Sequence, residues 1–140
     1  MPETVRDALR EDLEWYACRG AYFHTDAHYG DVLFGAWCID GPPREIVFSR
    51  AGIRVAARVG DWAIFDPFEP HAVLAQGESS YLRETYANAA PSHFVGFELA
   101  LSESVRGAFG IEEAPATAAR LSSDVAVNAQ TGRFDAIGRA

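Results

Sequence analysis

The sequence places a histidine and an aspartate two positions apart, in His24-Thr25-Asp26, at the end of a run typical of a β-strand. Because side chains alternate along a strand, these two lie on one face about 6.5–7 Å apart, a separation that one ion can bridge. His71 follows another apolar run and the turn 66–70, so it can approach from a neighbouring strand. Two imidazoles and one carboxylate on one side of an octahedral ion leave the opposite positions open, as in non-haem Fe(II) oxygenases.

A second pair with the same spacing is Arg83 and Thr85, in a segment, 81–87, that we expect to be a strand. On one face of a strand, the guanidinium and the hydroxyl could together hold a carboxylate, with two hydrogen bonds from the arginine. A buried arginine requires an anion. The pair therefore predicts a site for an acidic ligand.

The composition excludes several other kinds of chemistry. The chain has 140 residues and a net charge of -8, and its 12 basic residues are all arginines spread singly along it, which argues against a nucleic-acid partner. Without lysine there is no Schiff base, pyridoxal-phosphate attachment or Walker lysine. Neither G-x-S-x-G nor G-x-G-x-x-G occurs. Metal chemistry or plain binding remains.

The cysteine pattern and the lengths of the apolar runs indicate the cellular compartment of the protein. Cys18 and Cys38 lie in separate strand-like runs and form no C-x-x-C pair, so neither a disulfide scaffold nor a zinc knuckle is expected. No signal-like segment is found near the start, and the longest apolar run, 32–39, is too short to span a bilayer. We expect a cytoplasmic protein without a membrane partner.

The elements that must position these residues are mostly short strands within a single domain. Turn residues recur every eight to twelve positions, which is typical of an antiparallel sandwich or barrel. We expect strands at 21–26, 31–39, 45–49, 53–59, 62–65, 71–74, 81–87 and 93–99. A short helix over 4–14 precedes them, so that 1–15 is an N-terminal helix, 16–101 a β core and 102–140 a partly flexible extension, with a small helix at 102–109. Trp15, Trp37, Trp62 and Cys38 are expected to pack in the core.

The order of these residues resembles the 2-oxoglutarate and Fe(II)-dependent oxygenase superfamily, in particular its prolyl-hydroxylase-like branch. That pattern is H-x-D, a distal H and R-x-S, and here it corresponds to His24-Thr25-Asp26, His71 and Arg83-x-Thr85, with threonine in place of serine. The segments GPPREIVF (41–48) and VGDWAIFDPFEPHAV (59–73) also resemble the family. The resemblance covers roughly residues 15–99 and implies a mainly β fold, a double-stranded β-helix of the jelly-roll, cupin-like type.

By this resemblance, the protein is a dioxygenase that hydroxylates a C–H bond of a small molecule or peptide while converting 2-oxoglutarate to succinate and CO2. His24, Asp26 and His71 would be the catalytic ligands of Fe(II). Arg83 and Thr85 would hold the distal carboxylate of 2-oxoglutarate, and Tyr16 would donate a hydrogen bond to it. Tyr22 and His28 are expected to face the substrate.

Two other functions remain open at this point. Gly60-Asp61, Pro67 and Pro70-His71 also resemble the second motif of a cupin, a metal-dependent enzyme that would not use 2-oxoglutarate. A jelly roll without catalytic turnover would be a binding module. Because little chain precedes the metal-binding strand, either a homodimer that shares an exposed sheet face or an insertion of the C-terminal segment is expected to supply the missing cover.

Overall fold

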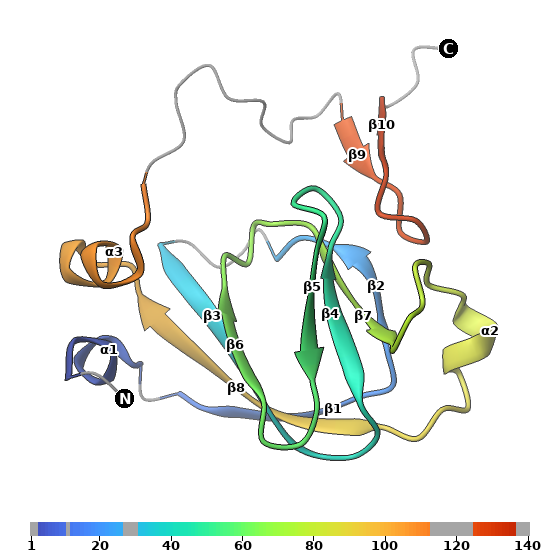
Figure 1. Cartoon of the computed structure of the whole chain (residues 1–140), viewed down its shortest axis with the longest axis horizontal. Helices are drawn as coiled ribbons and strands as arrows, with labels where there is room; N and C mark the ends of the chain where they lie inside the picture. The colour runs from blue at the N-terminus through green and yellow to red at the C-terminus, as the bar shows by residue number, and fades with distance from the viewer. Residues whose placement is uncertain (1–2, 11, 27–30, 113–124, 137–140) are drawn as a thin grey trace.

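Two four-stranded antiparallel sheets form the computed structural model, which describes residues 3–10, 12–26, 31–112 and 125–136 (Figure 1). The first, here called sheet A, has the order β1 (Glu14–Cys18), β8 (Ser92–Ala100), β3 (Val32–Asp40), β6 (Trp62–Phe65). The second, sheet B, has the order β2 (Ala21–His24), β7 (His71–Ala75), β4 (Arg44–Phe48), β5 (Ile53–Ala57). The chain passes repeatedly from one sheet to the other, which is the jelly-roll arrangement of a double-stranded β-helix. The predicted fold class is confirmed.

The core lies between the two sheets and follows from the alternation of side chains along each strand. Ala36, Cys38 and Phe94 of sheet A meet Ile46 and Phe48 of sheet B, and all five are buried. Cys38 is fully buried and has no disulfide partner among the described residues, as expected.

Two helices cover part of the outer face of sheet A. α1 (Glu3–Ala8) and α3 (Glu103–Phe109) lie side by side near the start of β3 and the end of β8 (Figure 1). They bury a second apolar cluster made of Val5, Leu33, Phe97, Leu99 and Val105. Ser102 begins α3 by accepting a hydrogen bond from the backbone N–H of Val105, and Gly110 ends it in the left-handed region at φ 63°.

The outer face of sheet B is covered differently, by α2 (Arg83–Tyr86) and by the hairpin of β9 (Val125–Val127) and β10 (Phe134–Ala136). Here Phe23, Val47, Ala72, Leu74 and Tyr86 are buried, with Val127 of β9 packed against them. Among the described residues, no helix is long and apolar enough to cross a membrane.

Two sequence expectations about local structure are wrong. Segment 81–87 contains helix α2 rather than a strand, because only Tyr86 is buried: its ring stacks on Tyr81 at 5.0 Å and its hydroxyl accepts a hydrogen bond from the N–H of Ala75. The N-terminal helix ends at Ala8 instead of 14, because the edge of β8 captures the following chain: the N–H of Arg10 donates to Glu98. β1 then supplies the eighth strand.

The three tryptophans are also misplaced by the sequence analysis, which expects them in the core. Their side chains point outward from sheet A, and the residues are 70% (Trp15), 47% (Trp37) and 51% (Trp62) exposed. The cause is again the alternation: Ala36 and Cys38, on either side of Trp37, take the inward positions of β3.

Candidate metal centre

A bulge in β2 aims His24 at the interior of the sandwich. The pairing of β2 with β7 shifts register between Ala21 and His24, so both residues line the same cavity although three positions separate them. Phe23, the residue before His24, points to the opposite face and is buried in the cluster under α2. Bulges of this kind commonly redirect a side chain next to a functional site.

Asp26, which follows β2, and His71, at the start of β7, lie close to His24. The N–H of Asp26 donates to the carbonyl of Pro67 at 2.8 Å, which ties the end of β2 to the turn that precedes β7. His71 begins β7 directly opposite His24, and their ring centroids lie 4.5 Å apart. His71 is 5% exposed and packs between the rings of Phe48 and Phe65.

The three side chains converge with their donor atoms facing one another. One ligand atom of each of His24, Asp26 and His71 lies within 4.8 Å of the others. The carboxylate oxygens of Asp26 lie 3.6 Å from Nε2 of His24 and 3.3 Å from Nε2 of His71. Bonds of about 2.1 Å to a metal put neighbouring ligands about 3 Å apart, so the cluster fits an ion after a small contraction.

A backbone carbonyl fixes the orientation of each imidazole by its contact with Nδ1. Nδ1 of His24 lies 2.6 Å from the carbonyl oxygen of Tyr22, and Nδ1 of His71 lies 2.7 Å from that of Glu69. A carbonyl can only accept, so each neutral ring carries its proton on Nδ1 and presents the lone pair of Nε2 toward Asp26. Such a second hydrogen bond usually accompanies histidines that bind metals.

These residues close one part of a cavity of about 220 Å³ between the sheets. Apart from the three residues of the cluster, Tyr16 and Cys18, its lining is apolar. Burial raises the pKa of the Cys18 thiol, while the N–H of Gly20 and the charge of Arg44 partly oppose the rise. A protonated thiol is a poor metal ligand and a poor nucleophile, so the imidazoles and the carboxylate are the ligands offered here.

Tyr16 lines this cavity, although not for the reason that its spacing suggests. The sequence analysis places Tyr16 and His24 on one strand, whereas the bend at 19–20 puts Tyr16 in β1 of sheet A and His24 in β2 of sheet B. Its ring stacks on Phe94 at 5.5 Å. Tyr16 and the metal cluster therefore belong to facing walls of one cavity.

Arg83 and Thr85 do not line the cavity. Both are exposed on α2, on the outer side of sheet B, and a spacing of two residues in a helix places side chains on different faces. Neither side chain has the shared face or the burial that a carboxylate clamp requires. The expectation that they sit together on a strand is wrong because the segment is helical.

The buried arginine of the sandwich is Arg44, which the sequence analysis did not single out. It is 5% exposed and points inward from β4, on the same face as Ile46, a residue of the cavity wall. Its Nη2 donates to the carbonyl of Ala90 at 2.7 Å, while Nε is buried with no hydrogen-bond partner in the described structure. A buried guanidinium usually has an anionic partner; among the described residues Arg44 has none, and it lies behind the residues that line the cavity and not among them.

Of the two residues expected to face the substrate, Tyr22 and His28, the structure describes only Tyr22. Tyr22 is 55% exposed, and its ring meets the edges of His24 and Tyr81, so it stands beside the metal cluster but outside the cavity. His28 lies outside the described residues.

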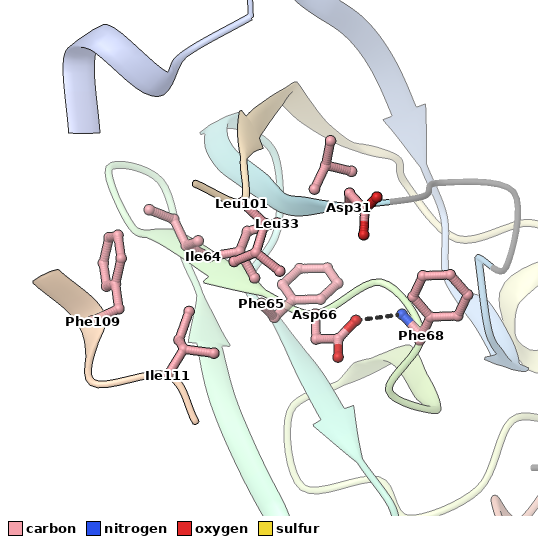
Figure 2. Close-up of a pocket in the computed structure, with 10 residues that line it drawn as sticks. Asp31, Leu33, Ile64, Phe65, Asp66, Phe68, Leu101, Phe109 and Ile111 are labelled. Atoms are coloured by element: carbon pink, nitrogen blue, oxygen red, sulfur yellow. Dashed lines mark hydrogen bonds between the residues drawn. The ribbon is translucent and has the colours of Figure 1, made fainter. Parts of the chain in front are cut away.

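A larger pocket of about 490 Å³ shares Phe65 with the inner cavity, but none of the three residues of the metal cluster lines it. Figure 2 shows Ile64, Leu101, Phe109 and Ile111 around it, with the carboxylates of Asp31 and Asp66 toward the side of Phe68. Asp66 accepts a hydrogen bond from the N–H of Phe68 at 2.9 Å, which shapes the turn before His71 (Figure 2).

Comparison with known proteins gives little beyond this geometry. No family model and no curated protein matches the sequence. Among solved structures, the EutQ protein of Clostridium difficile is 10% identical, with a TM-score of 0.34 over 66% of this chain and 52% of that one, so the chain spans about half of its length. Ectoine synthase from P. lautus is 11% identical, with a TM-score of 0.36 over 88% of this chain and 97% of that one. The functional argument therefore rests on the residues themselves.

Proposed function

We propose that this protein is an Fe(II)-dependent dioxygenase that uses 2-oxoglutarate and hydroxylates a C–H bond of a small molecule or peptide. The observation that carries the proposal is the convergence of two Nε2 atoms and one carboxylate, with both Nδ1 atoms held by carbonyls, at the wall of an apolar cavity. A ligand set of two histidines and one carboxylate is typical of non-haem Fe(II) oxygenases, in which the iron supplies the oxidation chemistry.

The protein's own residues would hold the metal and keep water away from it. His24, Asp26 and His71 would bind one side of the ion, and Phe65 and Phe34 form part of the apolar wall around it. At about 220 Å³, the cavity is smaller than most sites for drug-sized ligands, so it suits a compact cosubstrate. The substrate to be hydroxylated would then occupy the adjoining pocket beyond Phe65.

Arg44 replaces Arg83 in this proposal as the partner of the distal carboxylate of 2-oxoglutarate. Its guanidinium is buried, its Nε lacks a partner among the described residues, and its charge acts on Cys18 in the cavity wall. Arg83 is exposed on α2 and has none of these properties.

The proposal is tested by anaerobic titration of metal-free protein with Fe(II) and then 2-oxoglutarate, recording the visible charge-transfer band of a chelated keto acid. We expect the band in the wild type and its loss in His71→Ala. Arg44→Gln should lower the affinity for 2-oxoglutarate at least tenfold and leave the affinity for Fe(II) unchanged. The reason is that a hydrogen bond to a charged group contributes about 1.5–3 kcal/mol. Arg83→Ala is the matched control and should bind as the wild type does.

The possible outcomes of this titration distinguish the proposed function from its alternatives. Metal binding without the band would overturn 2-oxoglutarate as the cosubstrate and favour a cupin-type enzyme that does not use it, an alternative supported by the position of Arg83 and Thr85 on the surface. Weakening in Arg83→Ala but not in Arg44→Gln would overturn the assignment of Arg44. Tight binding of both ligands without succinate formation would identify a binding module. Circular dichroism and metal affinity of Arg44→Gln show whether that variant is folded.

A further inference from the structure

The outer face of sheet A carries a row of large apolar side chains that α1 and α3 leave uncovered. Trp15 of β1 stands opposite Val95 of β8, Val95 opposite Trp37 of β3, and Trp37 opposite Trp62 of β6. The row thus crosses all four strands of the sheet. We call it the tryptophan face.

A groove of about 450 Å³ runs along this face. Leu9 and Leu13 close one side, and Gly60, at the turn between β5 and β6, contributes another part of the wall. Leu13 is 59% exposed, so the uncovered surface continues beyond the tryptophans. Monomeric proteins seldom leave a contiguous apolar patch of this kind in water, and such patches mark interaction sites.

We propose that a second copy of this chain covers the tryptophan face, so that two sheets A pack against each other in a symmetric dimer. In a two-fold interface the same patch meets itself, and a row of aromatic and aliphatic side chains is self-complementary. This inference does not depend on the proposed enzymatic function.

The size of the face fits a second copy. An aromatic side chain buries about 150–250 Å². Three tryptophans that are 47–70% exposed, together with Leu13, therefore present on the order of 600 Å² per copy. Two copies would bury about 1,200 Å², the lower end of the range for specific protein interfaces. Interfaces at this end of the range are typical of weak or transient association, so we expect a dimer that dissociates on dilution.

The charges near the face disfavour the other partners. Arg58, in the turn beside Gly60, is bound to Asp61 at 3.0 Å and offers no free cation to a phosphate. The whole chain carries a net charge of -8, which opposes docking on an anionic lipid surface or a nucleic acid. The same net charge repels a second copy at long range, but the tryptophan face itself carries no charged side chain, so two copies would bury no unpaired charge there.

The chain contains three tryptophans, and all of them lie on this face, so their fluorescence reports on it directly. We expect sedimentation velocity on the full chain to show a species of twice 15.3 kDa that dissociates on dilution. Over the same concentrations, the tryptophan emission should shift to the red and acrylamide quenching should increase. Coincidence of the two transitions is the expected result.

A pair of charge variants completes the test. Trp37→Glu places a charge at the centre of the face and should give a monomer at concentrations at least tenfold above the wild-type midpoint. Ile53→Glu is the matched control, because Ile53 is 53% exposed on the edge strand of sheet B, and it should remain a dimer. Retained circular dichroism and metal binding would show that Trp37→Glu is folded.

Three results would overturn the proposal. The first is a wild-type monomer with solvent-exposed emission at every concentration up to several hundred micromolar. The second is a monomer whose emission is blue-shifted and protected from quenching, which would mean that a segment of the same chain covers the face. The third is a dimer that survives Trp37→Glu.

Discussion

The two faces of sheet A are built from the same strands and have opposite properties. Inward-facing Phe94 and Cys38 are at most 2% exposed and pack against sheet B, whereas outward-facing Trp15 and Trp37 are about half exposed or more. On the inner face, folding buries most of the apolar surface. On the outer face, it is used only where α1 and α3 cover it. Burial on this sheet therefore depends on cover and not on residue type, and substitutions on the two faces should differ accordingly.

The largest expected effect on stability is on the inner face. Phe94→Ala removes a ring that is 2% exposed, stacks on Tyr16 and lines the metal cavity, so the free energy of unfolding should fall by about 3–5 kcal/mol. The outward neighbour Val95 is its control: Val95→Ala should change the value by less than about 1.5 kcal/mol. Urea unfolding followed by circular dichroism measures both, and equal losses would contradict the contrast between the faces.

A smaller effect is expected where the outer face is covered. A methyl group added at Gly35 would collide with the ring of Phe97, which is 7% exposed beneath the helices. Gly35→Ala should therefore lower the free energy of unfolding by about 1–3 kcal/mol through overpacking.

Gly107→Ala supplies the comparison for Gly35→Ala. Gly107 lies in α3 with no heavy atom within 4 Å of an added Cβ, so alanine should raise the stability by about 0.5–1 kcal/mol. Thermal unfolding should shift in opposite directions for the two variants. A shift in the same direction would show that the packing of Phe97 against Gly35 is not as tight as described.

An effect of similar size concerns the start of the covering helix α3. Ser102 accepts a hydrogen bond from the N–H of Val105 and begins α3, so Ser102→Ala should lower the free energy of unfolding by about 1 kcal/mol. Ser102→Asp keeps an acceptor and should retain most of the stability. Amide hydrogen exchange in α3 measures the effect, which should be seen there before the strands between the sheets respond.

Much of the fold could be predicted from the sequence because turn residues separate short strands at regular intervals. The strand over Trp62–Phe65 appears where it is expected, and Ser102 begins the small helix after the core. The segment 81–87 could not be assigned from its composition, because Tyr86 is held by a tertiary contact with Ala75 that no local pattern contains. Whether Trp37 points outward likewise depends on whether the odd-numbered or the even-numbered residues of β3 face sheet B.

The candidate site could also be predicted from the sequence only in part. The separation of His24 and Asp26 by one residue, together with the turn before His71, was enough to bring these three side chains together in the prediction. The bulge that turns His24 inward leaves no mark in the sequence, since it arises from the pairing of β2 with β7. Arg44 was missed because an arginine at the start of a strand is ordinarily exposed, and only the structure shows that it is buried with Nε unpaired.

The most direct test of the metal centre is anaerobic calorimetric titration of the metal-free protein with Fe(II), comparing the wild type with His71→Ala and His93→Ala. His93 lies on the outer face of β8 beside Asp40 and is not part of the cluster. We expect one ion per chain in the wild type and in His93→Ala, and a loss of affinity of at least a hundredfold in His71→Ala, because losing a ligand weakens binding more than losing a group that orients one. Equal affinity in all three proteins would contradict the assignment of His24, Asp26 and His71 as a metal site.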